Sequence, residues 1–127
     1  MTKREIIAAV LLALLIALSV YNILSIDALT GEIGIALSKS QSAAEKLDFK
    51  TARGYLAEAL ERWLSAESYT HIFLRHPEID STADAFYDLQ QVLTQEDITA
   101  CAAAYSKLKY HLASIDQMEH LSLGSIL

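Results

Sequence analysis

The densest run of residues capable of chemistry lies between residues 67 and 80. These residues, here called the histidine corner, are Glu67, His71, Arg75, His76, Glu78 and Asp80. The first three are spaced four residues apart, so on a helix they share one side and can form a ladder of charge-assisted contacts. Imidazole and carboxylate groups are also suitable ligands for divalent transition metals. The corner is therefore our candidate interaction or ligand surface.

A metal site at this corner is one of two interpretations, the other being a solvated polar stripe. His71 and His76 are five residues apart. That spacing turns them about 140° from each other on a helix, unlike the i, i+4 histidine pair that binds zinc from one face. We therefore predict no metal ligands and no cofactor, and we expect the polar stripe.

Catalytic motifs are absent from the rest of the sequence. It contains no glycine-rich phosphate loop, no nucleophile elbow and no paired-cysteine metal motif. Cys101 is the single cysteine and stands among alanines, so we expect a small buried hydrophobic residue. We predict no catalytic residues and a protein that is not an enzyme.

One segment is apolar enough to cross a membrane. Residues 6–26 number 21, of which 18 are apolar and none is charged. As a helix they extend about 31 Å, which matches a hydrocarbon core of about 30 Å. Lys3 and Arg4 precede the segment, whereas the next basic residue is Lys39. The positive-inside rule then places residues 1–5 in the cytoplasm and residues 27–127 outside.

Two alternatives to a membrane anchor remain at this point. Ala17, Leu18 and Ser19 resemble the small-x-small site of a signal peptide, whose cleavage gives a secreted protein. The apolar run continues through Ile26, which favours the anchor. A buried core helix is the other alternative, although such helices rarely extend so far without a charge.

Residues 27–127 have the composition of an acidic helical domain. They hold eight Lys and Arg against fifteen Asp and Glu, a net charge of −7. This balance argues against binding nucleic acid. Val92 is the only valine among residues 27–127, and Ala and Leu dominate there, so we expect helices throughout this region.

Capping and breaking residues predict four helices. The first continues from the apolar segment to about Lys46, and Asp48 caps the second. The second helix has an apolar stripe that includes Ala52, Leu56, Ala59, Trp63 and Ala66.

The second pair of helices follows a proline. Pro77 predicts a helix end near His76 and a linker over residues 77–80. Ser81 then begins the third helix and Asp97 caps the fourth. The stripe of the fourth comprises Ile98, Cys101, Tyr105, Leu108, Leu112 and Ile115.

An offset of 49 residues aligns the two halves and pairs Asp48 with Asp97 and Leu56 with Tyr105. Since 49 is a whole number of heptads, chance agreement between two heptad patterns is the competing explanation. We predict an all-α fold in which the transmembrane helix continues into an antiparallel bundle of about four helices, built as two tetratricopeptide-like hairpins.

Several stretches resemble a known family. They are residues 3–5 (Lys-Arg-Glu) before the apolar segment, 58–63 (Glu-Ala-Leu-Glu-Arg-Trp), 71–76 (His-Ile-Phe-Leu-Arg-His) with 78–80 (Glu-Ile-Asp), and 121–127 (Leu-Ser-Leu-Gly-Ser-Ile-Leu). Together they are similar to the domain-of-unknown-function 4363 family of small bacterial membrane proteins. The resemblance implies a bacterial single-pass protein and, because that family has no established activity, supplies no catalytic residues.

These observations predict an accessory or scaffold protein of the bacterial cytoplasmic membrane that binds another membrane or envelope protein. The alternative is a sensor or binder of a small ligand or metal through the histidine corner. Ala9, Ala13 and Ala17 repeat every four residues and offer a small-residue face for a weak homodimer.

Overall fold

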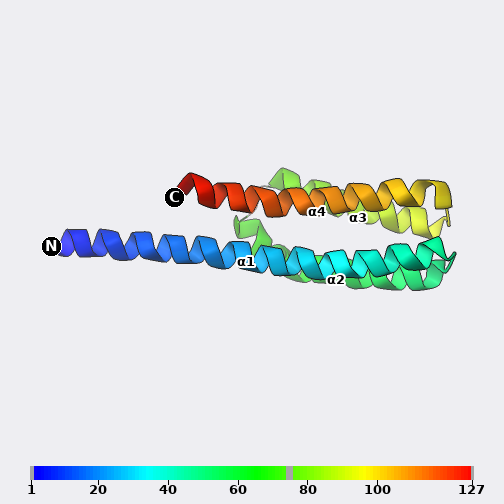
Figure 1. The fold of residues 1–127 in the computed structure, drawn as a ribbon, viewed down its shortest axis with the longest axis horizontal. Coiled ribbons are helices and arrows are strands. Elements are labelled where there is room, and N and C mark those ends of the chain that lie inside the picture. Colours follow the sequence, from blue (N-terminus) through cyan, green and yellow to red (C-terminus); the bar gives the residue numbers. More distant parts are fainter. Residues whose placement is uncertain (1, 74–75, 127) are drawn as a thin grey trace.

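A computed structural model describes residues 2–73 and 76–126, and the side chains of residues 2–66 and 79–117. It consists of four α-helices connected by short segments (Figure 1). The helices are α1 (Lys3–Glu45), α2 (Phe49–Phe73), α3 (His76–Thr94) and α4 (Ile98–Ile126). The all-α prediction is confirmed, as is the continuation of the apolar segment into a helical bundle.

Helix α1 is one helix of 43 residues, about 64 Å long at 1.5 Å per residue. It begins with a capping box in which Thr2 and Glu5 satisfy each other's backbone N–H groups. Its N-terminal part projects beyond the other helices (Figure 1). The residues before Asn22 are exposed or half-buried, and several after it are buried. One helix therefore serves both as the apolar extension and as a wall of the bundle.

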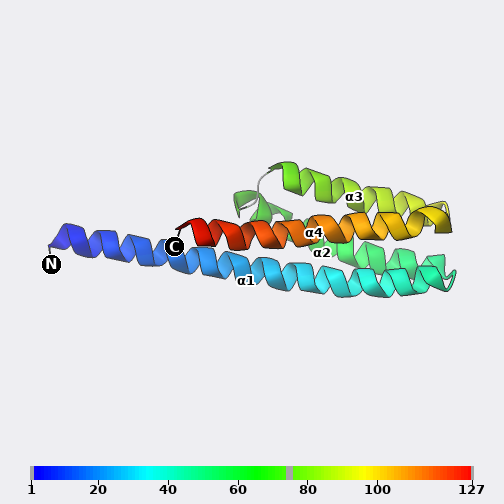
Figure 2. The same cartoon turned by 45° about the horizontal axis from the view of Figure 1, so that its top comes forward.

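The bundle is closed, because each helix packs against two neighbours. α1 contacts α2 and α4, and α3 contacts the same two helices. Consecutive helices are antiparallel, and the α1–α2 and α3–α4 turns lie together at the end far from the N-terminus (Figures 1 and 2). The two predicted hairpins thus pack side by side around one core.

The core consists mainly of the predicted apolar stripes. Trp63 is almost fully buried and packs against Phe86, with ring centroids 6.1 Å apart. Ile98 is a correction to the predicted stripe of α4, since it is 54% exposed. It is the first residue of α4, where the helix has no preceding turn to hold it against the core. The other buried apolar residues on the predicted stripes of α2 and α4 are Ala52, Leu56, Ala59, Cys101, Tyr105, Leu108, Leu112 and Ile115.

The α1–α2 turn is a Schellman motif with leucine at the left-handed position. Leu47 has φ 64° and its N–H donates to the Ala44 carbonyl at 2.9 Å, while the Asp48 N–H donates to the Ala43 carbonyl at 2.9 Å. Asp48 then caps α2, as predicted, by accepting from the Thr51 N–H at 3.2 Å.

The α3–α4 turn repeats this geometry 49 residues later. Glu96 has φ 56° and its N–H donates to the Leu93 carbonyl, while the Asp97 N–H donates to the Val92 carbonyl, both at 3.2 Å. Asp97 accepts from the Ala100 N–H at 3.2 Å. Each of these three hydrogen bonds has its counterpart 49 residues earlier. Two heptad patterns alone do not dictate matching turns, so the sequence repeat corresponds to a structural one.

The start of α3 corrects two predictions. α3 begins at His76, so residues 77–80 are its first turn and not a linker, and Ser81 lies inside the helix. Proline is well suited to this position, because N–H groups in the first turn have no partner within the helix and the fixed φ of proline is already helical. Pro77 therefore marks where a helix begins.

Candidate functional site

The histidine corner falls largely outside what the structure describes. Arg75 lies outside the described residues, and Glu67, His71, His76 and Glu78 lie outside the described side chains. Asp80 is exposed on α3. The corner therefore stays a sequence prediction. Within the described part of the chain, no group of three or more His, Cys, Asp or Glu residues is placed to hold a metal ion.

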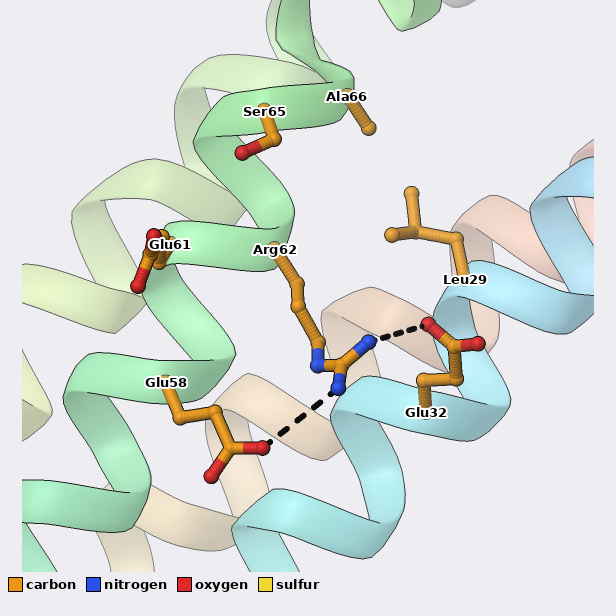
Figure 3. Close-up of a pocket in the computed structure, with 7 residues that line it drawn as sticks. All are labelled: Leu29, Glu32, Glu58, Glu61, Arg62, Ser65 and Ala66. Atoms are coloured by element: carbon orange, nitrogen blue, oxygen red, sulfur yellow. Dashed lines mark hydrogen bonds and ion pairs between the residues drawn. The ribbon is translucent and has the colours of Figure 1, made fainter.

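A groove between α1 and α2 is a better-defined surface. It has a volume of about 480 Å³. Figure 3 shows the seven side chains that line it, which are Leu29, Glu32, Glu58, Glu61, Arg62, Ser65 and Ala66. We call this surface the α1–α2 groove. It combines three carboxylates, one guanidinium, one hydroxyl and two apolar side chains.

Arg62 is held at the centre of the groove by two carboxylates. Its Nη1 donates to Glu32 Oε2 at 2.8 Å, and its Nη2 lies 3.6 Å from Glu58 Oε1 (Figure 3). All three side chains are about half exposed, so these ion pairs contribute little to stability. Their main effect is to fix the position of the guanidinium, which leaves fewer of its donors free for a ligand.

The third carboxylate, Glu61, adds to the negative charge of the groove. Glu61 points away from Arg62 in Figure 3 and is exposed. Leu29 packs against the bundle core and, with Ala66, adds an apolar wall. Three carboxylates against one guanidinium leave a net charge of −2 over this surface. Such a groove suits a basic side chain whose aliphatic stem contacts the apolar wall.

The sequence analysis did not predict this groove. Glu58 and Arg62 are spaced i, i+4, a pattern that indicates a helical ion pair. Glu32 is thirty residues from Arg62, so only the packing of α1 against α2 brings them together. No pattern in the sequence thus indicates that the groove residues of α1 and those of α2 lie together.

A second surface lies where α1 meets α4. Two hollows of about 560 and 510 Å³ share Gly31, Gly34 and Lys109. A Cβ atom at either glycine contacts nothing within 4 Å, so the surface is open at these positions. Lys109 is oriented by its hydrogen bond to Gln41 Oε1, at 2.6 Å. The helix continues through both glycines without a break.

Reactive groups in the bundle interior are protected. Cys101 is buried as predicted, and burial, followed by the nearby Asp97 carboxylate, raises the pKa of its thiol. A raised pKa lowers the fraction of reactive thiolate near neutral pH. The indole N–H of Trp63 has no hydrogen-bond partner within the described part of the chain. These residues belong to the core and line none of the grooves above.

Comparison with known proteins gives one match. The model of a family described as a domain of unknown function (DUF4363) matches residues 20–126. The matched stretch begins two residues before Asn22, where α1 starts to be buried in the bundle. Most of the apolar projection of α1 lies outside it. No curated protein and no solved structure matches the chain.

Proposed function

The chain belongs to the DUF4363 family of domains of unknown function, and we propose that it is a membrane-anchored accessory protein whose bundle binds another membrane or envelope protein without catalysing a reaction. The observation that carries the proposal is the continuity of α1. The same unbroken helix projects as an exposed apolar rod and then packs as a wall of the bundle (Figure 1). A bundle joined to its anchor in this way is held at a fixed height and orientation.

The anchor in this proposal is the N-terminal part of α1. It is long and apolar enough to cross a membrane, although a signal sequence passes the same test. We place the N-terminus in the cytoplasm of a bacterial cell, because Lys3 and Arg4 precede the apolar part and the bundle side carries a net charge of −7.

The α1–α2 groove is the proposed contact surface. Leu29 and Glu32 lie three and six residues beyond Ile26, the end of the apolar segment, so the groove stands close to the membrane. Its partner is expected to be a basic segment next to the membrane span of another protein. Opposite charge would steer that segment into the groove.

A photo-crosslinking amino acid at Ser65 tests this proposal in intact membranes. Ser65 is exposed and lines the groove, whereas Ser106, the matched control, is exposed on α4 away from it. We expect an adduct with a second membrane protein from position 65 and none from position 106. Adding Glu61→Lys should abolish the adduct, while Glu45→Lys, which changes the net charge equally, should leave it.

Equal adducts at both positions, or adducts that survive Glu61→Lys, contradict the groove as the contact. An adduct between two copies of this chain instead supports the homodimer. Absence of any adduct at position 65 overturns the proposed partner site, provided that both variants remain in the membrane fraction.

A further inference from the structure

The exposed apolar part of α1 is shorter than a membrane requires. Residues 6–21 are exposed or half-buried, whereas Asn22 and Ile23 are buried in the bundle. Sixteen residues extend about 24 Å, against about 30 Å for the hydrocarbon core of a bilayer. The full segment of residues 6–26 supplies the missing length, but Asn22, Ile23 and Ile26 are already buried in the bundle. The same stretch of α1 is therefore both buried in the bundle and needed to cross the membrane.

Helix α4 extends alongside this stretch. The contact between Ser40 and Tyr105 sets the antiparallel register of α1 and α4. Ile126 follows Tyr105 by twenty-one residues, and Ser19 precedes Ser40 by the same number, so the end of α4 is level with Ser19. Figures 1 and 2 both show α4 continuing past the α2–α3 connection toward the N-terminal end of α1.

Helix α2 reaches almost as far. The Arg62–Glu32 ion pair sets its register with α1. Phe73, the last residue of α2, follows Arg62 by eleven residues, and Tyr21 precedes Glu32 by eleven. The ends of α2 and α4 thus lie level with the stretch of α1 that is both buried in the bundle and needed to cross the membrane.

The sequence of these two ends differs from the rest of the bundle. Residues 121–127 and residues 68–73 contain no Asp, Glu, Lys or Arg, although residues 27–127 hold 23 such residues. Residues 121–127 include Leu, Ile and small residues only. Charged groups are costly at the depth of the acyl chains, so the charge-free end of α4 is compatible with that depth.

We propose that this end of the bundle is embedded in the interfacial layer of the phospholipid bilayer, with the last two turns of α4 in contact with lipid. The proposal rests on the membrane anchor of the proposed function. The acyl-chain boundary then covers α1 up to about Ile26, and Tyr21, which is 62% exposed, faces lipid there. The helix ends provide the contact that the exposed part of α1 is too short to make alone.

Fluorescence quenching by brominated phosphatidylcholine tests this depth. The full chain is reconstituted in vesicles of that lipid, with an environment-sensitive dye on one introduced cysteine in a Cys101→Ala background. The three labelled variants are Ser125→Cys at the end of α4, Ser106→Cys on its water-exposed part and Leu12→Cys in the apolar projection. We expect loss of emission at positions 125 and 12 and none at position 106.

The three positions separate this inference from the membrane anchor. Quenching at position 12 without quenching at position 125 overturns the embedded end but leaves the anchor intact. No quenching at either position overturns both. A dye at position 125 that is shielded from an aqueous quencher, yet insensitive to brominated lipid, indicates a protein contact and also contradicts the inference.

Discussion

The hydroxyl of Tyr105 lies 2.6 Å from Oγ of Ser40, and both groups are buried between α1 and α4. Ser40 Oγ also donates to the Ala52 carbonyl of α2 at 2.7 Å. Since the serine has only one proton and gives it to Ala52, the tyrosine is the donor to Ser40. A single buried serine therefore connects three helices through one polar chain.

Because Tyr105 donates to Ser40, removing one hydroxyl group or the other should lower the stability by different amounts. Tyr105→Phe leaves the Ser40–Ala52 hydrogen bond intact and should lower the free energy of unfolding by about 1 kcal/mol. Ser40→Ala leaves the tyrosine hydroxyl buried without an acceptor and should cost more, about 1–3 kcal/mol. Urea unfolding of the full chain in detergent, followed by the emission of Trp63, measures both. Trp63 is the only tryptophan and is buried in the core.

The double variant provides the control for this comparison. Without either hydroxyl, no buried polar group is left without a partner. The loss of unfolding free energy in the double variant should therefore be smaller than the sum of the losses in the two single variants. Additive losses, or a greater loss for Tyr105→Phe than for Ser40→Ala, contradict the assigned direction of the hydrogen bond.

The buried tyrosine also predicts an alkaline loss of stability. Burial raises the pKa of Tyr105 above its ordinary value of 10.0. The folded chain therefore keeps this proton at pH values where the unfolded chain releases it. Stability from this group is complete below about pH 10 and decreases as the pH rises further. The difference in unfolding free energy between wild type and Tyr105→Phe should be constant from pH 7 to 9 and shrink above 10.

Such a network illustrates what the sequence could and could not predict. The apolar stripe that contains Tyr105 was evident from its helical spacing, and its burial is confirmed. Ser40 carried no comparable signal, because a lone serine is compatible with an exposed face as well as with the core. Its role depends on the register of α1 against α2 and α4, which no local pattern encodes. The same reason explains why Glu32 was missed in the α1–α2 groove.

The turns were predictable in position but not in conformation. Asp48 and Asp97 were identified as caps because acidic residues before a helix satisfy its free N–H groups. The left-handed residues before them are Leu47 and Glu96, neither of which is the glycine that usually marks a Schellman motif. Pro77 is compatible with the end of one helix and with the start of another, because proline disfavours a continuing helix and favours the first turn of a new one. The sequence alone does not distinguish the two positions.

Leucine at a left-handed position predicts a stabilising substitution. Leu47 has φ 64° and is 61% exposed, so Leu47→Gly removes backbone strain and few contacts. We expect the free energy of unfolding to rise by about 0.5–1 kcal/mol in the urea experiment. Glu45→Gly, which replaces the last helical residue of α1, should instead lower it. Destabilisation by Leu47→Gly would show that the exposed leucine makes contacts that outweigh the strain.

The burial of Cys101 predicts that its thiol reacts slowly with thiol reagents in the folded chain. Burial and then the Asp97 carboxylate raise the pKa of Cys101 above 9.0, which reduces both the access and the thiolate fraction that a thiol reagent needs. We expect reaction with an aromatic disulfide reagent at pH 8 to be at least about tenfold slower in the folded chain than in urea. Ser106→Cys in a Cys101→Ala background is the exposed control and should react rapidly in both. Equal rates for Cys101 in the folded and unfolded chain contradict its burial.

The carboxylate of Asp48, which caps α2, is expected to make a contribution to stability that depends on acid pH. A neutral capping residue makes no such contribution. Hydrogen bonds from the Thr51 side chain and then its backbone N–H lower the pKa of Asp48 below its ordinary value of 3.8. The stability that this carboxylate contributes is present above that ordinary value and is lost as the pH falls through the lower, folded value. Asp48→Asn keeps the acceptor but does not titrate. Its unfolding free energy should therefore fall less than that of wild type between pH 5 and 2.5.

Asp84→Asn is the matched control for this acid experiment, because it removes one exposed carboxylate from α3 with the same change in net charge. If the two variants respond to acid identically, the effect is one of net charge and the cap contributes no specific acid dependence. If Asp48→Asn alone flattens the acid profile, the interaction with Thr51 is responsible. A third variant, Asp48→Ala, removes the acceptor at every pH and should therefore be less stable than Asp48→Asn even where the wild-type carboxylate is protonated.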